Sequence, residues 1–66
     1  MNYIASGFEM QQKFETLTEA KDAAEFAPWA DGRVWEVEEN FTGDPRLGGA
    51  LLEAVFIDGE GWSLNA

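Results

Sequence analysis

One segment of this chain has the periodicity of an amphipathic helix, and it limits how many faces of a sheet can be covered. The segment TLTEAKDAAEFA runs from position 16 to position 27. At about 100° per residue, its apolar side chains form one stripe. The residues of that stripe are Leu17, Ala20, Ala23, Ala24 and Ala27. Thr16 and Glu19 have the spacing of a capping box, and Pro28 cannot continue a helix. A stripe made mostly of alanine predicts close packing of this helix on a sheet.

The sequence on either side of this helix is typical of strands. Residues 2 to 14 mix β-forming residues with polar ones, and we expect them to be extended, with a bend or bulge at Gly7. Asp31-Gly32 predicts a turn, and the alternation that follows it predicts a strand from 33 to 41.

The last third of the chain adds a loop and two more strands. Glycine and proline in TGDPRLGG, 42 to 49, predict a loop. The most apolar segment, 50 to 58, is expected to be a central strand, followed by a turn at 59 to 61 and a short final strand at 62 to 65. We therefore predict a single α+β domain, 1 to 66, with one α-helix packed on one face of a four- to five-stranded antiparallel β-sheet.

Strand alternation assigns the side chains of these strands to two faces. The inward set is expected to be Leu52, Ala54, Phe56, Trp62 and Leu64, joined by Trp35 and Val37. Leu51, Val55 and Ile57 point to the other face, which a single helix cannot cover. They are exposed, paired with another chain, or covered by the loop at 42 to 49. The three Trp, five Phe and one Tyr are expected to form the core.

The residue types present argue against catalysis and metal binding. The chain has no cysteine and no histidine, which excludes disulfides, common zinc sites and a histidine-activated nucleophile. DGEG, at 58 to 61, lacks the alternating oxygen ligands of an EF-hand loop. Glu36 and Glu38 share a solvated strand flank, where nothing would separate their acidities into an acid and a base. We therefore expect no catalytic residue, no cofactor, no metal and no enzyme activity.

The net charge indicates the kind of partner. Thirteen acidic residues against four basic ones give a net charge of −9. Such a chain is repelled by nucleic acid and by anionic membranes, and it attracts basic protein surfaces. No apolar run reaches the roughly 20 residues of a membrane span, and the N-terminus has no secretory signal. We expect a cytoplasmic protein, in the host-cell cytoplasm if the chain is phage-encoded.

The positions of the acids lead to a more specific hypothesis. Glu36 and Glu38 lie two residues apart on a predicted strand, a separation of about 6 to 7 Å. Carboxylates fixed at such spacings on a rigid scaffold present a field similar to that of a nucleic-acid backbone. The residues predicted to bind a basic partner are Glu19, Asp22, Glu25, Glu36, Glu38 and Glu53. The hypothesis is a protein mimic of DNA that occupies a nucleic-acid channel.

A family resemblance agrees with this hypothesis. In size, acidity and lack of catalytic residues, the chain resembles the small phage-encoded inhibitors called anti-CRISPR proteins, several of which are acidic mimics of DNA. The order of the TLTEAKDAA helix and the GRVWEVEE, ALLEAVFID and GWSLN strands is similar to that of small inhibitors of type I CRISPR complexes. The resemblance implies that the partner is a Cas subunit and that binding blocks recognition of target DNA. It carries over no individual site residue.

Two other interpretations remain open. In the first, the acids serve only to hydrate a structural protein with no inhibitory role. In the second, Leu51, Val55 and Ile57 form a symmetric contact in a homo-oligomeric interaction module. Chains of charge −9 repel one another at low salt, so we expect a monomer rather than a homodimer.

Overall fold

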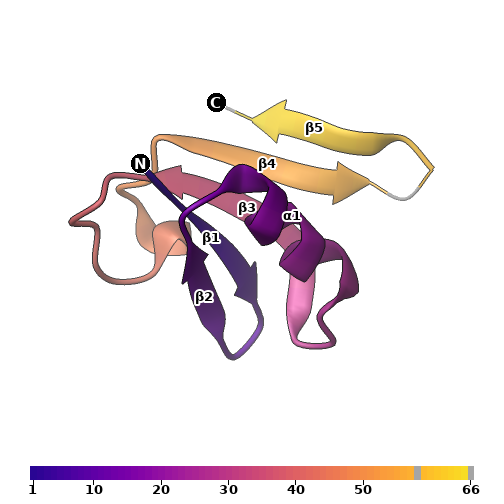
Figure 1. Ribbon diagram of the computed structural model, residues 1–66, viewed down its shortest axis with the longest axis horizontal. Coiled ribbons are helices and arrows are strands. Elements are labelled where there is room, and N and C mark those ends of the chain that lie inside the picture. The colour runs from indigo at the N-terminus through magenta and orange to yellow at the C-terminus, as the bar shows by residue number, and fades with distance from the viewer. Residues whose placement is uncertain (58, 66) are drawn as a thin grey trace.

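The computed structural model describes residues 1–57 and 59–65 and confirms the α+β class (Figure 1). Five strands form one antiparallel sheet in the order β2-β1-β3-β4-β5, and one helix packs on it. The strands are β1 (Asn2–Gly7), β2 (Gln11–Phe14), β3 (Ala30–Val37), β4 (Leu52–Ile57) and β5 (Gly61–Asn65). The helix α1 spans Leu17–Phe26, and a 3-10 turn, η1, spans Pro45–Leu47. β4 is an interior strand, as expected, although β3 occupies the centre of the sheet.

The helix has the predicted limits because both of its ends are fixed locally. The amide of Glu19 donates to Thr16 Oγ1 at 3.3 Å, and the Thr16 hydroxyl donates to the Glu19 carboxylate at 2.8 Å. At the other end the amide of Ala27 donates to the Ala23 carbonyl at 2.9 Å, and Pro28 follows. Thr16 thus satisfies one of the first helical amides that have no partner within the helix.

Alanine brings α1 close to the sheet, as predicted. Ala20 and Ala24 are buried, and with Ala5 of β1 and Val34 of β3 they form the core on this side. The helix packs mainly on β3 and β1. It reaches β5 through Trp62, whose Nε1 donates to the Glu25 carboxylate at 2.7 Å.

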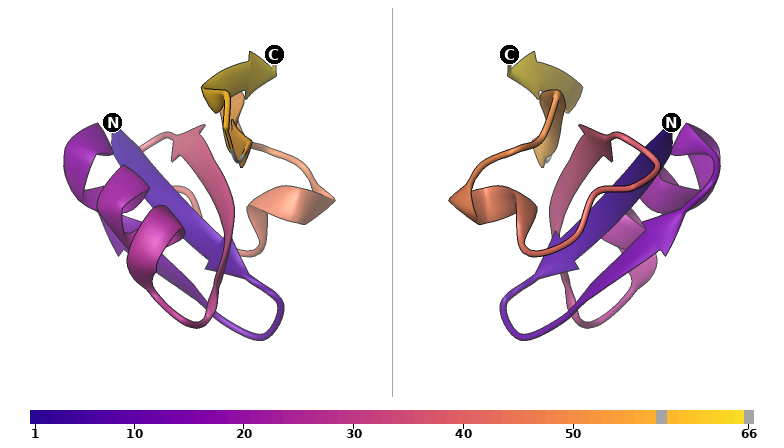
Figure 2. Two further views of the ribbon diagram at one scale, coloured as in Figure 1. Left: turned by 90° about the vertical axis from the view of Figure 1, so that its right-hand side faces the viewer. Right: turned by 90° about the vertical axis from the view of Figure 1, so that its left-hand side faces the viewer.

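The second face of the sheet is covered by the long connection between β3 and β4. Figure 2 shows α1 and η1 on opposite sides of β1 and β3. Pro45 of η1 is buried, and the side chains of Gln11 and Lys13 on β2 donate to the carbonyls of Gly43 (2.8 Å) and Phe41 (2.9 Å). Loop cover, one of the three alternatives considered for this face, is therefore present.

Loop cover is nevertheless incomplete around the residues that raised the question. Val55 is half-buried, but the side chains of Leu51 and Ile57 are still 50% and 41% exposed.

The assignment of Trp35 and Val37 to the inward set is wrong. Val34 pairs with Ala54 and Trp35 pairs with Glu53, so Leu52, Ala54, Phe56, Trp62 and Leu64 share their face with Val34. Trp35 and Val37 lie under the loop, where Trp35 Nε1 donates to Ser6 Oγ at 3.0 Å. A shift of one residue reverses every assignment on a strand. Here the sequence does not reveal the shift, because β3 is buried on both faces.

The strand predicted from 33 to 41 is displaced toward the N-terminus. β3 begins at Ala30, and Asp31-Gly32 is not a turn between elements. These two residues form a bulge between the pairs Gly7–Ala30 and Ser6–Arg33, and Gly32 has a φ of 83°. The strand ends at Val37, and the amide of Phe41 donates to the Glu38 carbonyl at 3.0 Å to form a turn. Glu36 and Glu38 therefore do not share one regular strand.

The remaining expected elements are present with small changes. The segment from 2 to 14 forms a hairpin with an irregularity at Gly7, as predicted. The strand predicted over 50 to 58 is observed from Leu52 to Ile57, and its predicted last residue, Asp58, lies outside the described residues. The final strand starts one residue earlier than expected, at Gly61.

Candidate partner-binding surface

Several carboxylates meet at one end of the sheet. β1 pairs Tyr3 with Phe14 and Asn2 with Val37, so the residues that follow β2 and β3 emerge beside the start of β1. Figure 1 shows the N-terminus, the ends of β2 and β3 and the start of α1 at this end. The residues concerned are Glu15, Glu19, Glu38 and Glu39, all exposed, and we call them the acidic end. Glu15 and Glu39 line one shallow hollow, and Glu39 also lies 3.7 Å from the amino-terminal nitrogen.

The helix continues this negative surface along its exposed side. Glu19, Asp22 and Glu25 are exposed and follow one another at intervals of three residues. Each interval advances about 4.5 Å along the helix axis and turns the side chain back by about 60°. The row therefore forms a steep ridge of carboxylates that starts at the acidic end. Glu25, at its far end, accepts the hydrogen bond from Trp62.

Glu36 and Glu53 lie on opposite faces of the sheet. Glu36 pairs with Leu52 across β3 and β4, on the helix side, and is half-buried. It lines a narrow groove with Leu17, Leu64 and other residues of the helix side. Glu53 pairs with Trp35 and is also half-buried, but on the loop side. The structure therefore does not bring Glu53 together with the other five predicted residues.

Both arginines bind carboxylates on the loop side. Arg33 Nη1 lies 2.9 Å from Glu53 Oε2, and Arg33 Nε lies 4.0 Å from Asp31 Oδ2. Arg46 donates to the same Asp31 oxygen, to Ser6 Oγ at 3.2 Å and to the Gly7 carbonyl at 3.3 Å. Arg46 thus attaches the loop to β1 and β3, and the two guanidinium groups neutralise Asp31 and Glu53.

The other predicted carboxylates have no such neutralisation. Within 1–57 and 59–65, no lysine, arginine or amino-terminal nitrogen lies within 4.0 Å of Glu19, Asp22, Glu25, Glu36 or Glu38. The two lysines make other contacts, although Lys21 lines the same groove as Glu36. Lys13 Nζ donates to the Phe41 carbonyl, and Lys21 Nζ lies 5.2 Å from the centre of the Trp62 ring. Five of the six predicted positions therefore present unpaired carboxylates.

The opposite end of the molecule exposes apolar side chains. Phe8 and Met10, at the tip of the β1–β2 hairpin, are 87% and 47% exposed, and Phe26 at the end of α1 is 78% exposed. Phe8 and Met10 line a hollow of about 470 Å³ with Trp29 and two other residues.

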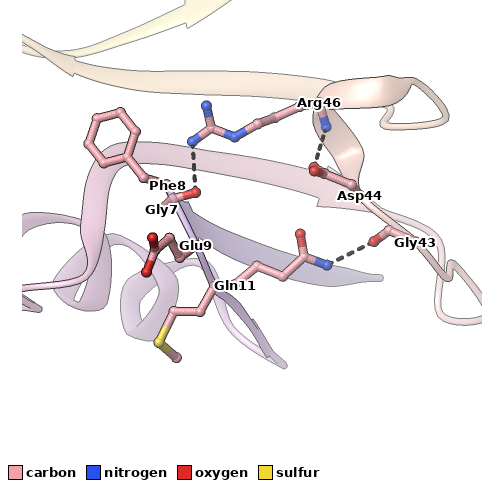
Figure 3. A pocket seen from close by; sticks show the side chains of 8 residues that line it. Gly7, Phe8, Glu9, Gln11, Gly43, Asp44 and Arg46 are labelled. Atoms are coloured by element: carbon pink, nitrogen blue, oxygen red, sulfur yellow. Dashed lines mark hydrogen bonds between the residues drawn. The ribbon is translucent and has the colours of Figure 1, made fainter.

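A second open hollow, of about 390 Å³, lies between this hairpin and the loop (Figure 3). In Figure 3 Gln11 reaches Gly43, and Arg46 reaches the Gly7 carbonyl. The polar side chains of Gln11 and Arg46 that line this hollow are therefore already hydrogen-bonded.

No protein-family model, no curated protein and no solved structure matches this chain. Within the described part of the chain, no group of three or more acidic side chains is arranged to hold a metal ion. Likewise, no helix there is long and apolar enough to cross a membrane.

Sequence reasoning missed the exposed aromatic residues at the apolar end. We expected all nine aromatic side chains in the core, and Phe8 and Phe26 are not there. Both positions carried a signal. Phe8 directly follows the glycine at which a bend was expected, and Phe26 lies about 120° from the centre of the alanine stripe on a helix with 3.6 residues per turn.

Proposed function

We propose that this chain is a small, non-catalytic inhibitor of phage origin that mimics DNA and binds the nucleic-acid-binding surface of a basic protein. The partner that fits the resemblance to anti-CRISPR proteins is a Cas subunit of a type I CRISPR complex. Binding would occupy the cationic surface that otherwise holds target DNA.

The observation that supports this proposal most strongly is the separation of charge. Within 1–57 and 59–65, the ridge on α1 and three of the four carboxylates of the acidic end have no cation within 4.0 Å, Glu39 lies near the amino-terminal nitrogen, and both arginines lie on the loop side. The ridge advances about 4.5 Å per carboxylate, against about 3.4 Å per phosphate along one strand of DNA. Lysine and arginine side chains are long enough to accommodate that difference.

The rigidity of the ridge also favours binding. Thr16 and Glu19 fix the start of α1, and Ala20 and Ala24 pack it on the sheet. The carboxylates of Asp22 and Glu25 therefore have a fixed backbone beneath them. A pre-ordered surface loses little conformational entropy on binding.

The proposal is tested with a purified type I CRISPR effector complex and its target DNA. The double variant Asp22→Asn/Glu38→Gln removes two unpaired carboxylates of the proposed surface. We expect it to reduce affinity for the complex about tenfold, since two surface charge pairs that contribute up to about 1 kcal/mol each set a limit of about thirtyfold. The same variant should lose the ability to displace target DNA.

A matched control separates specific contact from net charge. Glu9→Gln/Glu60→Gln removes the same charge from two exposed positions outside the ridge and the acidic end, and it should bind nearly as well as the unmodified chain. Affinity should also fall as salt rises. Equal weakening by both double variants would mean that charge acts only globally, and no binding at low salt would reject the CRISPR complex as partner.

A further inference from the structure

The outer edge of β5 is not protected in the ways that sheet edges usually are. β5 hydrogen-bonds to β4 on one side and is the last strand of the sheet. Exposed edges are commonly blocked by lysine, proline or a bulge. The segment Gly61–Asn65 contains no charged residue and no proline, and its register with β4 is continuous. At the other edge, by contrast, β2 carries Lys13, and its side chains bind the loop.

This edge is also held in a fixed position. Trp62 donates to Glu25, its ring lies under Lys21 Nζ, and its centroid is 5.6 Å from that of Phe56. Three contacts from two other elements therefore hold β5 against the helix. A strand that is already ordered loses little entropy when another strand pairs with it.

We propose that β5 pairs in antiparallel fashion with β5 of a second copy of this chain, about a two-fold axis at Ser63. Pairing in this register sets Leu64 opposite the partner's Trp62, since the two residues are equally distant from Ser63. Both side chains lie on the helix side of the sheet, and Leu64 is 68% exposed in the isolated chain. Contact between the exposed Leu64 side chain and the partner's Trp62 would remove apolar surface from water, which favours pairing. The edge is therefore complementary to itself.

Charge favours a second copy over a basic protein at this edge. A basic partner is attracted by carboxylates, and Gly61–Asn65 contains none. Repulsion between two chains of charge −9 is long-ranged, and salt shortens its range from about 30 Å at 0.01 M to about 3 Å at 1 M. The proposed dimer therefore strengthens with salt. The five-residue edge is short, so the dimer should be weak and should form only at high chain concentration.

The experiment is sedimentation equilibrium over a series of chain concentrations, at about 0.01 M and about 1 M salt. We expect the average mass to rise from 7.3 kDa toward twice that value at high salt only. Leu64→Lys should remain monomeric in both buffers. The matched control is Leu47→Lys, which changes charge equally at a leucine that is 89% exposed on η1. It should dimerise like the unmodified chain.

Each result decides the proposal. A mass that stays at 7.3 kDa at high salt overturns it, and so does a dimer that survives Leu64→Lys. The salt dependence is opposite in sign to that expected for a basic partner, so failure here is distinguishable from failure of the proposed inhibition.

Disulfide formation between two copies provides a second test, which does not depend on whether Leu64→Lys folds. Ser63→Cys introduces the sole cysteine of the chain on the proposed two-fold axis, where directly opposed Cβ atoms lie about 4.5 to 5.5 Å apart. It should oxidise to a disulfide-linked dimer faster at high salt than Thr42→Cys, an exposed control in the loop. Equal rates for the two variants would refute the register.

Discussion

Replacing Arg46 with methionine tests how the loop is held on the second face of the sheet. Arg46 donates to Asp31, Ser6 and the Gly7 carbonyl, so one side chain connects η1 to two strands. Methionine preserves much of the aliphatic stem but removes every donor. Among the cations of residues 1–57 and 59–65, the Asp31 carboxylate would then keep only Arg33, whose Nε lies 4.0 Å away.

The expected cost follows from the burial of the two partners. Breaking a fully buried ion pair costs about 3 to 5 kcal/mol. The Asp31 side chain is only 9% exposed, but that of Arg46 is 32% exposed, and a second guanidinium remains nearby. We therefore expect a loss of about 2 kcal/mol in the free energy of unfolding, below the range for a fully buried pair. For a domain of this size, that corresponds to about 8 to 16 °C in Tm.

The assay is urea unfolding followed by tryptophan fluorescence and by far-UV circular dichroism. Arg46→Met should lower the urea midpoint without changing the m-value. Arg46→Lys keeps the charge but loses the planar array of donors. Its urea midpoint should lie between those of the unmodified chain and Arg46→Met. The double variant Arg46→Met/Asp31→Asn also removes the buried Asp31 charge, which in Arg46→Met has lost its closer guanidinium partner. Its stability should be no lower than that of Arg46→Met.

Two results would refute this reasoning. An unchanged midpoint for Arg46→Met would mean that the loop is held by Pro45 and its apolar contacts alone. The single variant Asp31→Asn completes the comparison. If the double variant loses as much free energy of unfolding as Arg46→Met and Asp31→Asn lose together, Arg46 and Asp31 do not interact.

Four further changes test the packing and the helix cap. Trp35→Ala should destabilise the fold by about 3 kcal/mol in urea unfolding, since the half-buried indole fills the space under the loop. Gly7→Ala should prevent native folding as judged by circular dichroism, because its Cβ would lie 1.8 Å from the Trp29 carbonyl oxygen; a native-like spectrum and midpoint would contradict this close approach. Thr16→Ala should lower the free energy of unfolding by about 1 kcal/mol through loss of the helix cap. Phe8→Ser, at an 87% exposed position, should change the free energy of unfolding by less than about 0.5 kcal/mol.

The helix was predictable because its determinants are local. The capping residues, the alanine stripe and Pro28 all lie within thirteen consecutive positions, 16 to 28. No tertiary contact is needed to identify them. The α+β class followed from one such segment among strands.

The faces of β3 were not predictable, because alternation carries information only where one face is polar. Val34 and Val37 lie on opposite faces and are both buried, at 1% and 0% exposure. Both faces of the strand therefore carry apolar residues, and the sequence does not show which of them points toward the helix. The bulge at Asp31-Gly32 was missed for a related reason. Its local sequence is typical of a turn, but pairing of Ala30 and Arg33 with β1 includes it in the strand.

The cations, rather than the acids, decide how the charge of this surface is distributed. In the sequence, Glu53 and Glu36 were both acidic residues on predicted strands. Nothing in the sequence indicated that Arg33 would form an ion pair with Glu53. Arg33 binds Glu53 and Asp31, and Arg46 holds the loop, both on one face of the sheet. Neither arginine therefore neutralises α1 on the other face. The same contacts that stabilise a small domain thus leave its helix side negative. Stability and partner binding should therefore respond to different residues. Arg46→Met should weaken the fold while leaving affinity unchanged well below the melting temperature, and Asp22→Asn/Glu38→Gln should do the reverse.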